Sequence, residues 1–107
     1  MVSKEVIEDI KNRLVKAYNP IAIYLFCSHK WGRTTEECDL DLLIVVDKSE
    51  EKSFRRPIKG YDALRGLEYI PKDLIVQTKD EFERRSSENT TLEYKIKKSG
   101  ECIYARA

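Results

Sequence analysis

The sequence predicts an α/β domain in which helices flank a small sheet of three or four strands. Three observations predict this fold class. Short, almost wholly apolar runs, typical of strands covered on both faces, recur along the chain. Between them lie segments whose apolar residues are three or four positions apart, as on one face of a helix. The length of 107 residues suits one domain, residues 1–107, in which such an alternation gives α/β architecture.

The first two elements are a helix and a strand. Ser3 can cap the helix, and Asn19-Pro20 ends it, because the residue before a proline avoids the α region. The apolar face of this helix consists of Ile7, Ile10, Leu14 and Tyr18. Residues 21–26 are almost continuously apolar and predict the first strand.

The middle of the chain predicts a second strand, a loop and a second helix. Residues 39–46 begin with two carboxylates and become continuously apolar, which indicates a buried strand. Residues 47–57 are highly charged and have no clear period, so a surface loop is expected there, with Arg55 and Arg56 in solvent. Residues 58–69 predict a helix, although its two glycines weaken helical propensity.

The last third predicts one more strand, two short helices and an extended end. Residues 74–76 form the predicted third strand. Thr78 and Glu81 make a capping box for a helix that runs to Arg85. Residues 89–91 can cap a helix over 92–98, with Gly100 in its C′ position, and residues 102–104 form a terminal strand or an extended tail.

Composition excludes several classes of protein. The 20 Lys and Arg residues nearly balance the 19 Asp and Glu residues, which argues against a strongly basic nucleic-acid-binding module. No apolar run approaches the roughly 18 residues of a membrane span, and the polar start of the chain does not resemble a signal peptide. The three cysteines lack C-x-x-C spacing, so we expect reduced thiols in a cytoplasmic protein.

Two carboxylates at the start of the second strand are the main chemical signal. Asp39 and Asp41 point to the same face, because side chains alternate along a strand. At about 4 Å and an effective dielectric near 20, their repulsion is on the order of 4 kcal/mol. A shared proton, a neighbouring Lys or Arg, or a divalent cation would offset it. The alternative is a solvated pair, since Asp is common where strands begin.

Asp73 lies in a similar position, just before the third strand. If the second and third strands are neighbours, three carboxylates converge, and such an oxygen-only ligand set favours Mg²⁺ or Mn²⁺ over zinc. Ser28 follows the first strand at a turn, where free backbone N–H groups can hold a phosphate.

These residues resemble a known signature. Residues 25–28, Gly32 and residues 39–46 are similar to the G-S-x10-D-x-D motif of the nucleotidyltransferase superfamily, which has the DNA polymerase β-like fold with a small mixed sheet. The length is similar to that of its minimal single-domain branch, the MNT proteins. The resemblance continues through residues 73–76 and 96–104, so it covers nearly the whole chain.

The resemblance implies a role for each matching residue. Asp39 and Asp41 would bind the metal ions, and Asp73 would be a third carboxylate that helps to bind metal and to activate the attacking hydroxyl. The implied reaction transfers a nucleoside monophosphate from a triphosphate such as ATP to a hydroxyl, with Mg²⁺ or Mn²⁺ as cofactor. The implied nucleotide-binding residues are Cys27, Ser28, Lys30 and Arg33.

Cys27 departs from the family motif, which has glycine at that position. A turn that needs a left-handed residue would cost roughly 1–2 kcal/mol with cysteine, and the thiol occupies space near the phosphate path. The family's basic residue after serine is His29 here, and Lys30 and Arg33 can restore positive charge. His29 is otherwise an exposed turn residue, and Trp31 either stacks on a base, lies in an interface or packs over the sheet edge.

The resemblance also implies partners. Members of the MNT branch typically pair with a HEPN-domain protein, and in such pairs the MNT protein acts as the antitoxin of a toxin–antitoxin system, in some cases by AMP transfer. The acceptor would be a protein or RNA hydroxyl, and the active species a homo- or hetero-oligomer. The alternative is a catalytically degenerate binding module that neutralises its partner by contact alone.

Overall fold

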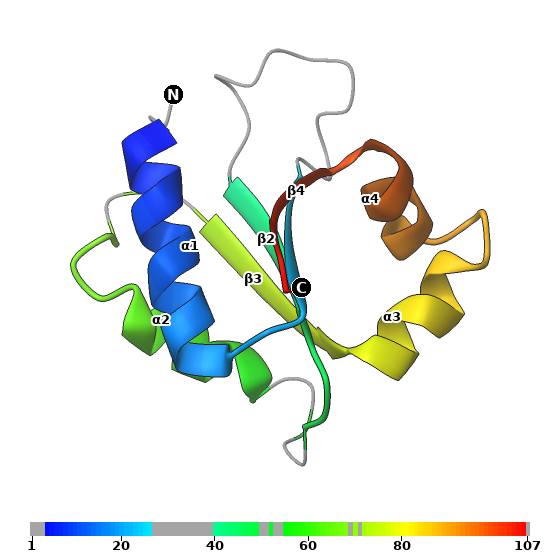
Figure 1. Ribbon diagram of the computed structural model, residues 1–107, viewed down its shortest axis with the longest axis horizontal. Helices are drawn as coiled ribbons and strands as arrows, with labels where there is room; N and C mark the ends of the chain where they lie inside the picture. The colour runs from blue at the N-terminus through cyan, green and yellow to red at the C-terminus, as the bar shows by residue number, and fades with distance from the viewer. Residues whose placement is uncertain are drawn as a thin grey trace.

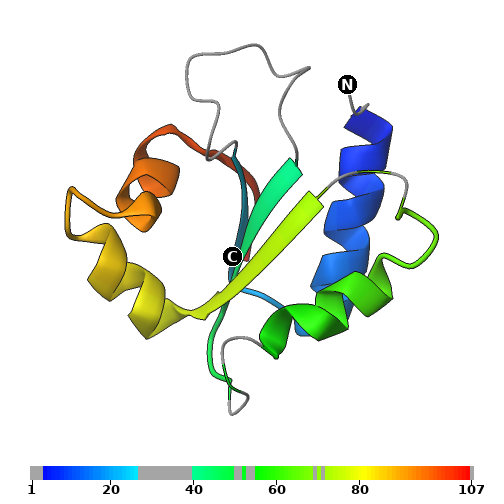
Figure 2. The ribbon, with the colours of Figure 1, turned by 180° about the vertical axis from the view of Figure 1, so that it is seen from behind.

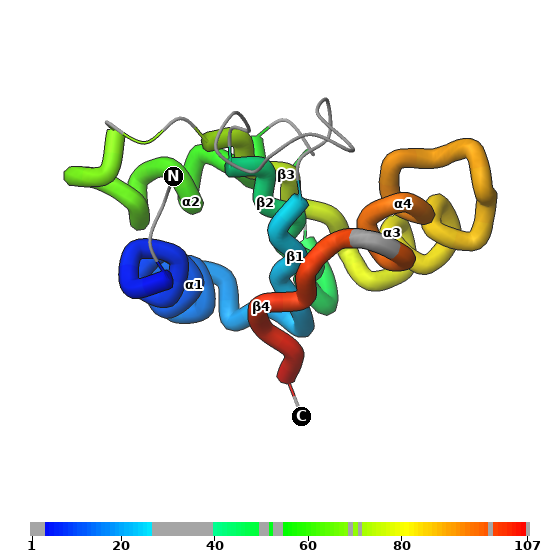
Figure 3. The backbone as a smooth tube through the Cα atoms, turned by 90° about the horizontal axis from the view of Figure 1, so that it is seen from above, coloured from blue at the N-terminus to red at the C-terminus, as the bar shows by residue number. Residues whose placement is uncertain are grey.

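The computed structural model describes residues 4–26, 40–49, 52, 55–68, 70 and 72–106. Four strands form a mixed sheet in the order β3-β2-β1-β4. The elements are α1 (Lys4–Tyr18), β1 (Ala22–Phe26), β2 (Leu40–Val46), α2 (Arg56–Ala63), β3 (Lys72–Thr78), α3 (Lys79–Ser86), α4 (Leu92–Ser99) and β4 (Glu101–Ala105). Helices α1 and α2 lie on one side of the sheet and α3 and α4 on the other (Figures 1 and 3). The predicted α/β class, with helices flanking a small mixed sheet, is confirmed.

The central strands of the sheet differ in direction. Strand β1 is antiparallel to both β2 and β4. Strand β2 is parallel to β3 over seven residue pairs, from Leu40 opposite Lys72 to Val46 opposite Thr78. Figure 2 shows β2 and β3 side by side, with β3 at the outer edge of the sheet. The two parallel strands therefore begin at the same end of the molecule.

Alternation along β2 divides the core into two clusters. Leu42, Ile44 and Val46 pack with residues of α1 and of the segment that follows α2. Leu43 and Val45 pack on the opposite face, with residues of α3 and α4. Because both faces of β2 are covered, each of these side chains is almost fully buried and contributes roughly 1.5–3 kcal/mol. The burial of both faces explains why the sequence of this strand is continuously apolar.

Several predicted helix ends are correct. Helix α1 ends at Tyr18, and Asn19 then adopts a left-handed backbone with φ of 49°. Asparagine is tolerated in that conformation, and Pro20 follows it. The capping box of Thr78 and Glu81 is present at the start of α3. Thr91 caps α4, whereas the predicted Ser3 cap lies outside the described residues.

The predicted boundaries of α2 and β3 are wrong. Helix α2 begins at Arg56, because Pro57 fits the first turn of a helix, and the turn that follows contains Gly66 with φ of 98°. Strand β3 covers seven residues instead of the predicted 74–76, because β2 pairs with it along its whole length. Asp73 therefore lies inside the strand.

Two features of the C-terminal part differ from the sequence-based prediction or decide between its alternatives. Gly100 is the C-cap of α4 with an extended backbone at φ of −73°, so it is not the left-handed C′ residue that was predicted. The last segment is a strand, β4, which pairs with β1, and the alternative of an extended tail is wrong. No helix in the described part of the chain is long and apolar enough to cross a membrane.

The Tyr18 hydroxyl joins α1 to α2. It accepts a hydrogen bond from the Gly60 N–H at 2.7 Å and donates one to the Arg56 carbonyl. We expect Tyr18→Phe to lower the free energy of unfolding by about 1–2 kcal/mol, because both backbone groups lose a partner. Urea denaturation measures this value.

Tyr94→Phe is the matched control, since this half-buried hydroxyl makes no comparable bridge between helices in the described chain. It should change the free energy of unfolding by less than about 0.5 kcal/mol. Equal effects of the two substitutions would contradict a role of Tyr18 in holding α2.

Candidate active site

The register of the parallel strands places Asp41 directly opposite Asp73. Adjacent strands are about 4.8 Å apart, and residues in register on parallel strands project from the same face of the sheet. Both aspartates lie near the beginnings of their strands, so the two carboxylates are neighbours at one end of the sheet. The condition of the sequence-based expectation, that the second and third strands are neighbours, is met, and the role of these two carboxylates stays a prediction.

The carboxylates lie on the face covered by α3 and α4. Asp41 alternates with Leu40 and Leu42 and so shares a face with Leu43 and Val45, which belong to the cluster on that side. Phe26 of β1 is the register partner of Asp41 on the other flank. Asp41 is only 4% exposed, whereas Asp73 is exposed on the edge strand. One carboxylate is thus enclosed and the other is open to a second molecule.

This arrangement fits a divalent cation. Two neighbouring carboxylates repel each other, and burial of one of them adds a desolvation cost. An ion between them offsets both costs, and oxygen-only ligands suit Mg²⁺ or Mn²⁺. Lys72, the residue beside Asp73, is directed elsewhere, because its ammonium donates to the carbonyls of Leu67 at 2.6 Å and Ile70 at 3.1 Å.

The remaining predicted site residues lie outside the described part of the chain. They are Asp39, Cys27, Ser28, Lys30 and Arg33, together with His29 and Trp31. Among the residues that the structure describes, no group of three or more His, Cys, Asp or Glu side chains could hold a metal ion. The structure therefore brings together two of the three predicted carboxylates, and the roles of all these residues stay predictions.

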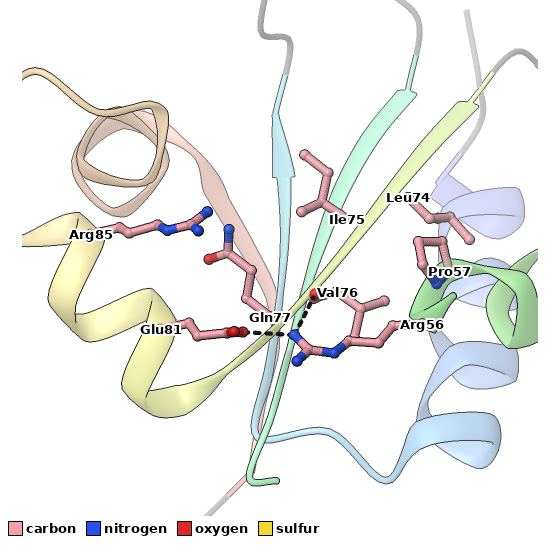
Figure 4. A pocket seen from close by; sticks show the side chains of 8 residues that line it. All are labelled: Arg56, Pro57, Leu74, Ile75, Val76, Gln77, Glu81 and Arg85. Atoms are coloured by element: carbon pink, nitrogen blue, oxygen red, sulfur yellow. Dashed lines mark hydrogen bonds and ion pairs between the residues drawn. The ribbon is translucent and has the colours of Figure 1, made fainter. Parts of the chain in front are cut away.

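A second feature, which we call the β3 groove, lies around the far half of the edge strand. It is a hollow of about 320 Å³ lined by residues 74–77 of β3, Arg56 and Pro57 of α2, and Glu81 and Arg85 of α3 (Figure 4). Because β3 is the edge of the sheet, the groove reaches from the α2 side to the α3 side. It was not predicted from the sequence.

A salt bridge crosses the groove. Arg56 is 9% exposed, and its Nη1 lies 2.7 Å from Glu81 Oε1 and 3.4 Å from the Val76 carbonyl (Figure 4). Hydrogen bonds from Arg56 and from the Thr78 backbone lower the pKa of Glu81 from 4.5 to about 2. The expectation that Arg56 is a solvated loop residue is wrong. No local pattern reveals this pairing, because 25 residues separate the two partners.

A buried polar cluster lies on the α3 side of the groove. Gln77 is 6% exposed and donates from Nε2 to Glu93 Oε2 at 2.6 Å, and Arg85 lies 3.4 Å from the same oxygen. Burial raises the pKa of Glu93, but hydrogen bonds from Gln77, its own backbone and Arg85 bring it below its ordinary value. The buried Gln77 Oε1 has no hydrogen-bond partner within the described structure.

The lowered pKa of Glu81 predicts a loss of stability in acid. Its ionised form stabilises the fold above pH 4.5, and that contribution disappears as the pH falls toward about 2. Glu81→Gln keeps the cap acceptor but removes the charge, so it should lower stability at pH 7 and make little difference near pH 2. Urea unfolding at a series of pH values measures this difference. Glu83→Gln, at an exposed position of the same helix, should show no such pH dependence.

Comparisons with known proteins agree with this geometry. The family model described as "Polymerase beta, Nucleotidyltransferase" matches residues 8–107. A comparison with curated protein sequences gives no match. Among solved structures, the fold is similar to that of a candidate nucleotidyltransferase from Sulfolobus solfataricus, with a TM-score of 0.64 and 20% sequence identity, over 95% of this chain and 79% of that chain. The match over nearly its whole length shows that this chain belongs to the polymerase β-like nucleotidyltransferase family.

Proposed function

We propose that this chain is a metal-dependent nucleotidyltransferase that moves AMP from ATP to a hydroxyl group of a protein or RNA acceptor. The observation that supports this most strongly is the register of Asp41 with Asp73 at one end of the parallel strands. Enzymes of this family generally use a nucleoside triphosphate and a divalent metal ion. The neighbouring oxygen ligands suit that chemistry.

The difference in exposure suggests a different role for each carboxylate. Asp41, enclosed between Phe26 and Asp73, would hold a metal ion together with Asp39. Asp73, exposed on the edge strand, would face the acceptor and take the proton from its hydroxyl. When bound, Mg²⁺ supplies charge neutralisation at the phosphates. The acceptor oxygen bonds to the α-phosphorus, the bond to the bridging α–β oxygen breaks, and pyrophosphate leaves.

The proposed phosphate contacts come from the residues that follow β1 in the sequence. Ser28 would contact the triphosphate, and Lys30 and Arg33 would add positive charge near it. The partner we propose is a HEPN-domain protein, with this chain as the antitoxin of the pair. What supports this partner is the resemblance of the sequence to the MNT branch of the family.

Substitution of the carboxylates tests the reaction. Asp41→Asn and Asp73→Asn should each reduce AMP transfer at least about a hundredfold, the first by weakening metal binding and the second by removing the proton acceptor. The measurement is label transfer from ATP labelled in its α-phosphate to the co-purified partner, with intact mass confirming a gain of one AMP.

Asp62→Asn is the control, because within the described residues this exposed carboxylate pairs with the nearby surface residue Arg65. It should leave transfer unchanged. Because Asp73 is exposed, its substitution also separates a catalytic defect from misfolding. Undiminished transfer by both Asp41→Asn and Asp73→Asn would refute the proposed site.

Cys27 favours a second candidate function, neutralisation of the partner by contact alone. The family has glycine at this position, where a phosphate must approach the backbone. If the chain is an impaired enzyme, Cys27→Gly should raise AMP transfer several-fold. If neither the wild type nor this variant binds ATP with Mg²⁺ in calorimetry, while the partner is still neutralised, the contact-only function is correct.

A further inference from the structure

We propose that the free edge of β3 is a docking site for an extended polypeptide segment of the acceptor, running parallel to β3. The segment would occupy the β3 groove and add a fifth strand to the sheet. Its role as acceptor rests on the proposed function, but its docking does not.

The backbone of the edge strand is only partly satisfied. The Leu74 N–H donates to the Tyr61 hydroxyl at 3.1 Å, and the Val76 carbonyl accepts from Arg56 at 3.4 Å. These two residues therefore direct their backbone groups away from β2. The Leu74 carbonyl and the Val76 N–H point the same way, since the N–H and carbonyl of one strand residue share a direction. Neither receives a partner from α2 or α3 in the described chain.

The two remaining groups define the direction of the added strand. In a parallel pair, each bonding residue of the new strand lies opposite one residue of β3. Its N–H donates to the carbonyl of the β3 residue that precedes this partner, and its carbonyl accepts from the N–H of the β3 residue that follows it. The Leu74 carbonyl and the Val76 N–H flank Ile75 in this way. A parallel segment can bind at these two groups, and pairing that extends past them displaces the Tyr61 hydroxyl from the Leu74 N–H and Arg56 from the Val76 carbonyl. Two-fold pairing of β3 with a second copy would be antiparallel, so it does not fit as well.

A side chain of the segment can satisfy Gln77. The Oε1 atom of Gln77 is buried in the groove wall and lacks a donor within the described structure, which is costly for a buried acceptor. Figure 4 shows this side chain on the α3 side of β3, near Arg85. Because this atom is enclosed, an amide or hydroxyl donor of the segment reaches it only if docking moves the side chains that cover it.

The wall formed by α2 favours a polypeptide over a small polar ligand. Ile58 is 63% exposed and Tyr61 is 44% exposed, and they are the large exposed hydrophobic residues of the described chain. They are three residues apart on α2 and do not line the β3 groove itself, but Ile58 directly follows Pro57 of its wall and the Tyr61 hydroxyl reaches the Leu74 N–H. Exposed apolar side chains beside an unpaired sheet edge are typical of a protein interface.

The groove leads to the carboxylates. Gln77 is four residues from Asp73 on the same face of β3, which is roughly 13 Å along the strand. A segment that follows the edge toward Asp73 would bring a Ser, Thr or Tyr hydroxyl to the position where the proposed reaction needs it. Such docking would supply a protein hydroxyl as the acceptor, as the proposed function already requires.

Peptides selected from a phage-displayed random dodecapeptide library on the full chain, without ATP, are the probe. We expect selected peptides to slow hydrogen exchange of the Val76 amide and to bind Ile58→Glu about tenfold or more weakly in fluorescence anisotropy. Lys97→Glu, an exposed change on α4, should bind as the wild type does.

Four outcomes would overturn the docking site: no selected peptide, unaltered affinity for Ile58→Glu, an unprotected Val76 amide, or a homodimer that Ile58→Glu dissociates. Peptide binding by Asp41→Asn separates docking from catalysis, because it must persist when AMP transfer is lost. If transfer to the partner is retained by Ile58→Glu and no peptide binds, the docking site is wrong and the proposed function stands.

Discussion

The parallel pairing of β2 with β3 is the constraint on which the rest of this structure depends. Parallel strands cannot be joined by a tight turn, so the chain crosses over through α2 before it returns to the sheet. The pairing brings Asp41 and Asp73, 32 positions apart in the chain numbering, into register. A slip of one residue would move Asp73 to the other face and separate the two carboxylates.

The same pairing leaves β3 as an edge strand, and this gives its two ends different properties. At its beginning, Asp73 is exposed beside the enclosed Asp41. Along its outer edge, the Tyr61 hydroxyl accepts from the Leu74 N–H, Arg56 donates to the Val76 carbonyl, and Glu81 accepts from the Thr78 N–H. Covering an edge in this way limits aggregation. The cover is incomplete, and the β3 groove is where we propose that a partner docks.

Charge in this protein is distributed in pairs rather than as a patch. Arg56 with Glu81 and Arg85 with Glu93 are ion pairs around the groove, and the chain as a whole carries a formal net charge of +1. Such a surface gives little general attraction for nucleic acid, since that attraction depends on excess positive charge. The proposed partner would therefore be recognised through hydrogen bonds and shape, as expected for a defined segment at a strand edge.

The amino-acid sequence alone determined the features that depend on near neighbours. The end of α1 before Pro20, the capping box of Thr78 and Glu81 and the family signature around Asp41 could all be read from it, because each depends on residues a few positions apart. Only the tertiary structure decided the strand order, the full length of β3, the start of α2 and the burial of Arg56. These features depend on contacts between segments that are distant in the sequence. The free energy of such contacts comes from packing and from the entropy of closing the chain between the segments, and the local propensities of the residues do not contain that information.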